Sequence, residues 1–349
     1  MHAIYHMTYL QAVVIGLIQG LTELFPISSL GHTVLIPSWF GGTWATLVSQ
    51  ESDAESPYLA FIVGLHLATA IVLLGYYAKT WVRIIRGFFT SIATRRIESA
   101  DQRLAWLLVV ATIPVGVAGL VLEHPFRVLF AKPLAAAIFL TINGGILFAG
   151  EVLRRRRAQE AVPNAVPGGA PRRQPVVQPA GVTPTAQPAA GSPHAMRAEP
   201  SRLRGERDER DALLDQAADE RLAAAVGVKS AVWIGALQIL ALFAGISREG
   251  VTMAGGLFRG LSHEDALRFS FLLSTPVILA AGALKLSDLT GPLGQGLRGQ
   301  VLAGSVAAAA TSLFAVVFLA RYFRTRTLTP FAIYCVAAGL ISIIRFGIF

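Results

Sequence analysis

Two short polar segments lie inside otherwise apolar stretches of this chain. The first segment carries Gln19, Thr22, Glu23, Ser28, Ser29 and His32, and the second carries Gln238, Ser247, Arg248, Glu249 and Thr252. An ionisable side chain in apolar, membrane-like surroundings is costly, needs a partner and marks a functional site. We therefore expect the two segments to form one site, in which Glu23 and Arg248 are opposite charges that pair.

The residue types and spacings of this site favour the binding of an anion. Gln19 and Glu23 are four residues apart and share one helix face, and Pro26 ends that helix. Ser28 or Ser29 can cap the next helix, and Ser247 can cap a helix in the second segment. Two helix N-termini would then direct free N–H groups at the site, which suits phosphate most obviously. Arg248 would add a forked donor that matches phosphate oxygens.

Simpler interpretations of these residues stay open at this point. Ser28 and Ser29 could serve as caps alone, and His32 could be a buried histidine with satisfied hydrogen bonds. Glu23 and Arg248 could form a purely structural ion pair. Glu249 could face the cytoplasm or pair with Arg248. His66, a lone histidine on an apolar run, is better explained as a helix-packing or hydrogen-bonding residue.

Apolar runs provide the elements that must position these residues. Most runs are near the ~20 residues that a membrane-spanning helix needs, and they fall at about 8–25, 58–78, 104–122, 133–153, 226–244, 266–286, 299–320 and 329–349. Shorter broken stretches at about 28–40 and 248–260 follow the first and fifth runs directly. Each such pair predicts a re-entrant hairpin of two half-helices.

The two hairpin segments resemble each other. When Gly16–Thr33 is aligned with Gly235–Thr252 without a gap, seven positions are identical, including Gln19 with Gln238 and Ser28 with Ser247. The fold class that follows is an all-α integral membrane protein. It is an inverted-repeat helical bundle with about six transmembrane helices and two re-entrant helix hairpins, and its ligand site lies where the broken helices meet.

Composition and charge agree with a membrane protein. The chain is 54% hydrophobic and only 15% charged, and its one cysteine excludes a disulfide framework. The chain has a net charge of +9. In a membrane protein such an excess of basic residues is expected in cytoplasmic loops, so it does not indicate nucleic acid as a partner. These basic loops lie between the second and third runs, at Arg154–Arg157, and between the last two runs. A homodimer is left open.

The chain divides into three parts. Residues 1–153 form the first repeat half, and residues 226–349 form the second. The intervening 154–225 form a cytoplasmic insertion, disordered and rich in Pro and Ala, with a charged segment that could be a short exposed helix. Nine of the chain's 18 prolines lie between 158 and 200, where no helical or strand period occurs. This stretch is therefore interpreted as a solvated tether.

Both polar segments resemble signatures of the bacterial undecaprenyl-diphosphatase, or bacitracin-resistance, family. The run from Gln19 to His32 resembles the first signature, and Gly245-Ile-Ser-Arg-Glu-Gly-Val-Thr252 resembles the second. Weaker matches occur at Leu65–Thr69, Phe269–Leu273 and Pro330–Tyr334. The resemblance covers the chain except about 155–225, and a long Pro-rich insertion is not typical of the family.

The resemblance implies an enzyme of the bacterial plasma membrane. It implies hydrolysis of undecaprenyl diphosphate, a polyprenyl diphosphate lipid, on the outer face, stimulated by a divalent cation such as Mg²⁺ or Ca²⁺. Glu23 and the Gln19 position would act as base or metal-holding groups, Ser29 or His32 as nucleophile or acid/base, and Arg248 would hold the diphosphate.

The remaining polar residues of the two segments complete the expected site. Ser28, Ser247, Thr252 and Gln238 would bind substrate, and Glu249 is a further candidate metal ligand. Gln19, Ala244 and Glu249 depart from the commoner residues of the signatures, and Gln19 cannot serve as a general base. A polyprenyl-phosphate transporter or flippase that uses the same groups without hydrolysis is the alternative, because inverted repeats with broken helices are also a transporter plan.

Overall fold

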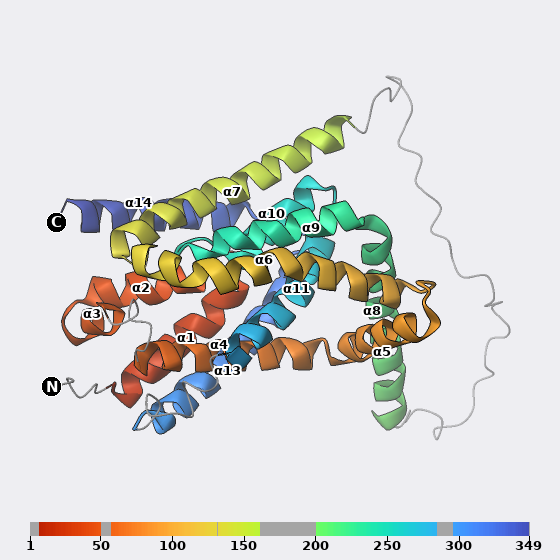
Figure 1. Cartoon of the computed structure of the whole chain (residues 1–349), viewed down its shortest axis with the longest axis horizontal. Coiled ribbons are helices and arrows are strands. Elements are labelled where there is room, and N and C mark those ends of the chain that lie inside the picture. The colour runs from red at the N-terminus through yellow and green to blue at the C-terminus, as the bar shows by residue number, and fades with distance from the viewer. Residues whose placement is uncertain (1–6, 50–56, 131, 161–199, 285–295, 349) are drawn as a thin grey trace, which may run out of the picture.

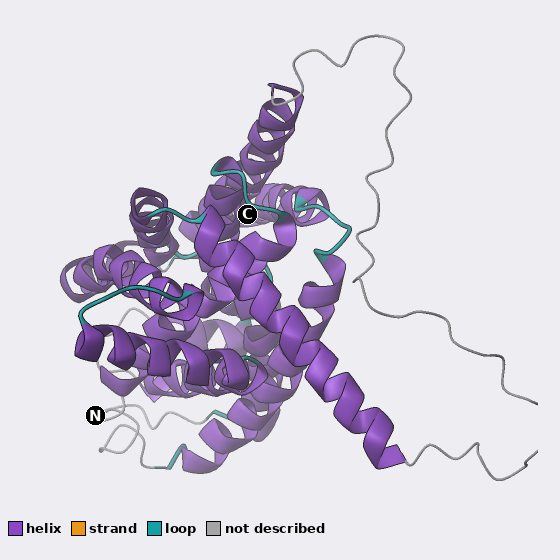
Figure 2. Cartoon of the chain, turned by 90° about the vertical axis from the view of Figure 1, so that its right-hand side faces the viewer, coloured by secondary structure: helices purple, strands orange, loops and turns teal. Residues whose placement is uncertain are grey.

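The computed structural model describes residues 7–49, 57–130, 132–160, 200–284 and 296–348, and within these ranges every regular element is a helix (Figure 1, Figure 2). In chain order the helices are α1 (Tyr9–Leu24), α2 (Ser29–Phe40), α3 (Gly42–Ser49), α4 (Pro57–Tyr76), α5 (Ala78–Thr94), α6 (Ala100–Phe130), α7 (Pro133–Glu160), α8 (Pro200–Ala225), α9 (Val228–Leu237), the 3-10 turn η1 (Gln238–Leu242), α10 (Arg248–Phe258), α11 (His263–Leu284), α13 (Arg298–Tyr322) and α14 (Thr329–Gly347).

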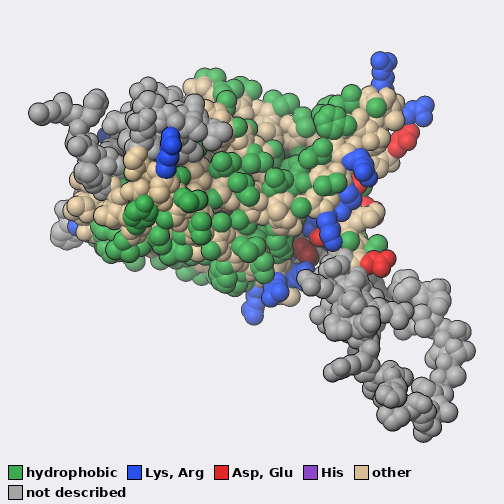
Figure 3. Space-filling view, turned by 90° about the horizontal axis from the view of Figure 1, so that it is seen from below, with side chains coloured by type: hydrophobic (Ala, Val, Ile, Leu, Met, Phe, Trp, Pro, Cys, Tyr) green, Lys and Arg blue, Asp and Glu red, His purple; other side chains and the backbone are tan. Residues whose placement is uncertain are grey.

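Long apolar helices cross the molecule where the sequence predicts them. Among the described residues, five helices are long and apolar enough to span a membrane, namely Ala100–Leu122, Pro133–Arg157, His263–Leu284, Arg298–Tyr322 and Thr329–Gly347. Two bent helix pairs, 61–94 and 212–242, raise the number to as many as seven. The side of the molecule seen in Figure 3 is covered by hydrophobic side chains, as a lipid-facing surface requires.

Both predicted helix breaks are present. Helix α1 ends at Leu24, before Pro26, and α2 begins at Ser29; η1 ends at Leu242, and α10 begins at Arg248. The caps are Ser28 and Ser247, whose Oγ atoms accept from the N–H groups three residues further on, Gly31 and Gly250, at 3.2 and 3.1 Å. Ser28 has a positive φ of 71°, which lets the chain turn sharply after Pro26.

The first helix of each repeat half packs against a helix of the other half. Helix α1 packs on α13, and α9 packs on α6. Both contacts use the equivalent glycines Gly16 and Gly235, because a Cβ atom would lie 2.3 Å from the Gly304 oxygen at the first and 1.9 Å from the Ala111 oxygen at the second. Small residues allow such close backbone approach between membrane helices. The internal repeat in the sequence is thus a repeat in the packing.

The segment between the second and third apolar runs is a helix rather than a loop. Helix α5 bends away from α4 by 84° and carries Lys79, Arg83 and Arg86. Val82 and Phe89 on its open face are 61% and 64% exposed. The charge and the apolar residues alternate with a helical period, which is the pattern of an amphipathic helix lying along a membrane surface. The sequence predicts the basic residues of this segment correctly, and the helix that carries them is a finding of the structure.

The charged end of the insertion is also helical and is partly buried. Residues 161–199, where the solvated tether was predicted, lie outside the described residues. Helix α8 docks on the bundle through Asp219, which is 1% exposed and bonds to Arg83, to Thr80 and to Arg268 Nε at 2.7 Å. The expectation of a short exposed helix is therefore wrong for this end of α8, because its carboxylate neutralises two arginines of the membrane bundle.

Contacts at one end of the bundle bring the three basic segments together. Glu151 Oε1, near the end of α7, accepts from the Leu328 N–H at 2.7 Å and contacts His263 Nε2 at 2.6 Å. The start of α11 is thereby tied to α7 and to the α13–α14 connection, and through Arg268 to α5 and α8. All three segments therefore lie on one side, as the positive-inside rule requires, and Lys and Arg gather at one end in Figure 3.

Candidate active site

Glu23 is the centre of the polar cluster at the first break. Its Oε2 atom accepts from Gln19 Nε2 at 3.0 Å and from the Ser29 hydroxyl, and it lies 3.2 Å from His66 Nε2. Glu23 itself is 4% exposed. The helical spacing of Gln19 and Glu23 produces the first contact, and the turn at Pro26 folds α2 back so that Ser29 reaches the same oxygen.

His66, on α4, has a more specific role than helix packing. Its Nδ1 lies 2.9 Å from the Ile62 carbonyl oxygen, which can only accept a hydrogen bond, so Nδ1 carries a proton. Nε2 then faces Glu23 Oε2, and a carboxylate also only accepts. One further proton must therefore lie between the two groups, either as imidazolium against carboxylate or as imidazole against carboxylic acid. The histidine thus gives Glu23 a partner that can hold or release a proton.

Arg248 occupies the first position of α10. Its Nη1 atom is buried and has no hydrogen-bond partner in the described part of the chain. The guanidinium lies close enough to Glu23, His66 and Glu249 to interact with them electrostatically. The expected proximity of Glu23 and Arg248 is therefore present, but the direct ion-pair contact of Glu23 is with His66. A buried donor without a partner is available to a ligand.

Glu249 is buried rather than directed at the cytoplasm. It is 2% exposed, and its Oε1 accepts from the Ser274 hydroxyl on α11 at 2.9 Å. This carboxylate also interacts electrostatically with Glu23 and Arg248. The site thus contains two carboxylates around one arginine, one from each repeat half.

The two capping serines also join the two breaks to each other. Ser28 Oγ accepts from the Gly245 N–H at 3.2 Å, and Ser247 Oγ donates to the Phe25 carbonyl at 3.3 Å. Asn143, on α7, fastens both breaks, since its Nδ2 donates to the Pro26 carbonyl at 3.0 Å and its Oδ1 accepts from the Ser247 N–H at 3.0 Å. The two helix N-termini are consequently held side by side.

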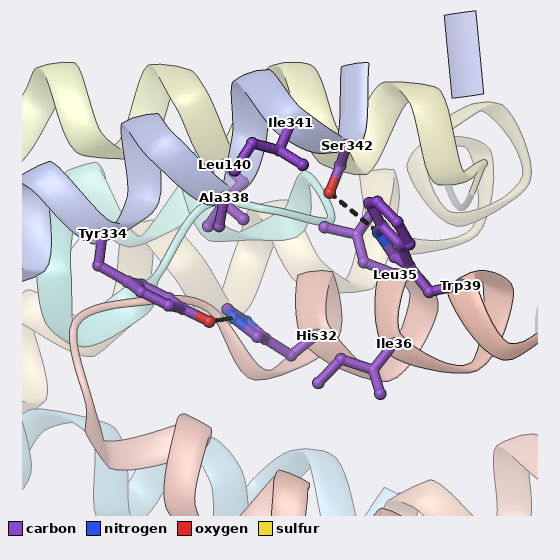
Figure 4. Close-up of a pocket in the computed structure, with 9 residues that line it drawn as sticks. All are labelled: His32, Leu35, Ile36, Trp39, Leu140, Tyr334, Ala338, Ile341 and Ser342. Atoms are coloured by element: carbon purple, nitrogen blue, oxygen red, sulfur yellow. Dashed lines mark hydrogen bonds between the residues drawn. The ribbon is translucent and has the colours of Figure 1, made fainter. Parts of the chain in front are cut away.

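His32 has hydrogen-bond partners other than Glu23. Its Nδ1 donates to the Ser28 carbonyl at 2.6 Å, so in the neutral ring Nε2 accepts from the Tyr334 hydroxyl at 2.8 Å. Figure 4 shows the two rings in line at the edge of a pocket of about 230 Å³, which Trp39 and Ser342 close at its other end. Its walls come from α2, from Leu140 on α7 and from the middle and later part of α14, between Tyr334 and Ser342. Leu140 lies toward the end of α7 that is opposite Arg154–Arg157.

The other candidate binding residues are buried between helices. Thr252 Oγ1 lies 2.5 Å from Ser270 Oγ, and Gln238 Nε2 donates to the Gly235 carbonyl at 3.5 Å. Gln19 Oε1 and Gln238 Oε1, which are equivalent atoms of the two repeats, are both buried without a hydrogen-bond partner in the described structure. The structure thus brings Gln19, Ser29, Arg248 and Glu249 around Glu23 and places His32 at the neighbouring pocket.

Sequence reasoning missed His66 and Asn143 as members of the site. A signal existed for both, since each is a polar residue within an apolar run at membrane depth, where such residues are expensive. His66 also lies in one of the weaker motif matches, Leu65–Thr69. Neither spacing nor motif could indicate that these residues meet the two breaks, because the meeting requires packing of α4 and α7.

Comparisons with known proteins agree with this architecture. The family model for "Bacitracin resistance protein BacA" matches residues 12–168 and 206–341. The chain is 53% identical over 349 residues to undecaprenyl-diphosphatase 2 of Frankia alni, which covers 99% of both chains. It is 52% identical to the undecaprenyl-diphosphatase of Mycolicibacterium paratuberculosis, over 97% of both chains. The matched family residues stop at 168 and resume at 206, whereas the Frankia alni similarity continues through the insertion.

Proposed function

The chain belongs to the bacitracin resistance protein BacA family, and on this premise we propose that it is a multi-pass membrane phosphatase that hydrolyses undecaprenyl diphosphate to undecaprenyl phosphate and inorganic phosphate. This reaction returns the lipid carrier to cell-wall synthesis. The observation that carries the proposal is the pairing of the Ser29 hydroxyl with Glu23 beside Arg248, whose buried Nη1 has no hydrogen-bond partner among the described residues. Neither the comparisons nor the described structure favours the transporter alternative.

Glu23 acts as the general base in this proposal. The Ser29 hydroxyl donates to its carboxylate, so Glu23 can accept a proton from Ser29 or from a water that takes the same position. The nucleophile forms a bond to the terminal phosphorus while the P–O bond to the lipid phosphate breaks, and undecaprenyl phosphate leaves. A water nucleophile gives inorganic phosphate directly, whereas attack by Ser29 gives a phosphoserine that a water must then hydrolyse to release inorganic phosphate. The base role requires the imidazolium–carboxylate form of the pair, in which His66 stabilises the charge that Glu23 carries before the transfer. His32 is a weaker candidate for the nucleophile, because both of its ring nitrogens are engaged elsewhere.

The terminal phosphate is held by the arginine and by two helix ends. Arg248 supplies the donor that has no protein partner, and the serine caps use only the third N–H of α2 and α10. The first N–H groups of each helix remain for the phosphate oxygens. Phosphoryl transfer depends mainly on positioning and charge stabilisation, and prealigned donors in a dry site can supply most of the rate.

A divalent cation, Mg²⁺ or Ca²⁺, fits these residues only when the substrate shares in binding it. Among the described residues, no group of three or more His, Cys, Asp or Glu side chains could hold a metal ion alone. Glu23, Glu249 and the unpartnered Gln19 Oε1 are oxygen donors of the type that such cations prefer. A bound cation would neutralise phosphate charge.

We further propose that the protein lies in the plasma membrane with its active site facing outside and its insertion in the cytoplasm. The three basic segments lie at one end of the bundle, and such an end is normally cytoplasmic. The pocket beside His32 includes Leu140, toward the end of α7 that is opposite Arg154–Arg157, and the middle and later part of α14. This arrangement favours access to the site from the outer side.

Phosphate release from undecaprenyl diphosphate by the purified protein tests the mechanism. We expect Glu23→Gln and Arg248→Ala each to lower kcat by about 10²-fold or more, because each removes a charged group at the reacting phosphate. Glu98→Gln and Arg96→Ala are matched controls, since these side chains are 70% and 76% exposed and form a surface pair. EDTA should reduce the rate if a cation assists. A folded Glu23→Gln protein with activity within a few-fold of wild type would exclude Glu23 as the base.

A further inference from the structure

A second hollow lies along α13, on the membrane-facing surface and outside the catalytic cluster. It has a volume of about 710 Å³. Its apolar wall contains Leu313, Phe314, Val317 and Phe318, and two of these side chains are more than half exposed, Leu313 at 52% and Phe314 at 59%. The rings of Phe314 and Phe318 are stacked with centroids 5.9 Å apart. The wall is therefore a continuous apolar surface that nothing in the described structure covers.

The hollow ends in a basic and hydroxylic group of side chains. Arg321, Tyr322, Thr325 and Arg326 line that end, and it belongs to the side of the bundle where the basic segments gather. Within the described residues, neither Arg321 nor Arg326 has an ion pair, whereas Arg324 between them lies 3.8 Å from Glu264. Two unneutralised guanidinium groups at the end of an apolar hollow complement an anionic group attached to a hydrocarbon chain.

The length of the hollow matches one leaflet of a bilayer. From Ala310 to Arg321 the helix rises roughly 16 Å at about 1.5 Å per residue, and half of a hydrocarbon core about 30 Å thick is about 15 Å. An acyl chain lying along Phe314 and Phe318 would therefore place its headgroup at the two arginines. Basic pockets beside membrane helices bind anionic headgroups in this way.

We propose that this hollow is a binding site for an anionic membrane phospholipid. The phosphate contacts Arg321 and Arg326, the Thr325 hydroxyl at the same end of the hollow is a further donor, and one acyl chain lies on the α13 wall. The site is independent of the phosphatase chemistry. A phospholipid fits better than the isoprenyl lipid product because the wall accommodates only one leaflet's depth of chain.

Binding of defined lipids to the delipidated full-length protein tests the proposal. Native mass spectrometry would count the phosphatidylglycerol molecules retained by wild type, by Arg321→Ala/Arg326→Ala and by Arg324→Ala, with phosphatidylcholine as the neutral lipid. We expect wild type and Arg324→Ala to retain one tightly bound phosphatidylglycerol. The double variant should bind it at least tenfold more weakly, with unchanged phosphatase activity showing that it is folded.

Three results would overturn the proposal. They are equal retention by the double variant, equal loss in Arg324→Ala, and equal binding of phosphatidylcholine. Undecaprenyl phosphate is added as a separate arm, and tighter binding of that lipid than of phosphatidylglycerol at the same arginines would reject the phospholipid as the occupant.

Discussion

Asn143→Ala should strongly destabilise the protein, although no sequence motif marks this residue. The side chain is fully buried, and its two hydrogen bonds of 3.0 Å hold the Pro26 carbonyl and the Ser247 N–H. Alanine leaves the Ser247 N–H without its partner and leaves the Pro26 carbonyl with only the long contact from Cys335 Sγ at 3.9 Å. An orphaned buried polar group costs about 1–3 kcal/mol, although hydrogen bonds between membrane helices average only about 0.6 kcal/mol. For the two backbone groups together these figures span about 1 to about 6 kcal/mol, and we expect a loss of about 2–4 kcal/mol.

Unfolding in mixed micelles by increasing fractions of SDS measures this loss directly. Thr112→Ala is the control, because its hydroxyl donates to the Leu108 carbonyl of its own helix, and its cost should stay below about 1 kcal/mol. Asn143→Ala should also lower phosphate release at temperatures where the variant is folded, since the side chain that hydrogen-bonds to both helix breaks is lost. A free energy of unfolding within about 1 kcal/mol of wild type would refute the assigned role of Asn143.

Three further predictions concern single sites. His66→Phe should lower kcat by about 10²-fold with a folded protein, and phosphate release close to wild type would exclude a role for this histidine at the carboxylate. Gly20→Val should prevent stable folding, because a Cβ would lie 2.1 Å from a backbone oxygen of the facing helix. Gly116→Val is the control, because a Cβ at that position meets nothing within 4 Å. Similar yields of folded protein from the two variants would contradict this prediction. Asp219→Ala should cost up to about 3–5 kcal/mol, because it removes the buried carboxylate that Arg83 and Arg268 share and leaves Arg268 with the half-exposed Asp215 alone. Asp215→Ala, at a side chain 48% exposed, should cost under ~1 kcal/mol, and SDS unfolding measures both losses.

Local rules accounted for the helices and for the two breaks. Apolar runs of membrane length predicted the long helices to within a few residues, apart from the ends of α6 and α7, which continue beyond the predicted runs. Pro26 and the serine caps predicted where α1 ends and where α2 and α10 begin. These features depend on residues within one or two helical turns, so the sequence alone contains the information.

The errors concern segments whose structure depends on a neighbour. The sequence predicts a basic loop where α5 lies, because the segment is too polar to cross a membrane. The helix packs its other face against α6, a contact that the sequence does not show. Helix α8 was interpreted as exposed because it is highly charged. Only the tertiary structure shows that Asp219 meets Arg83 and Arg268 from two other helices.

Residues that are neighbours in the chain are enough to predict a membrane protein with two related breaks, with an acid and an arginine near them that suit phosphate chemistry. Hydrophobic periodicity, caps and repeat identity are read from neighbouring residues, so no packing is needed to recognise them. The tertiary structure alone decided the partners: His66 on α4 pairs with Glu23, Asn143 on α7 joins both breaks, and His32 turns to Tyr334. These contacts link residues far apart in the chain, because close helix packing, not sequence spacing, sets which side chains meet.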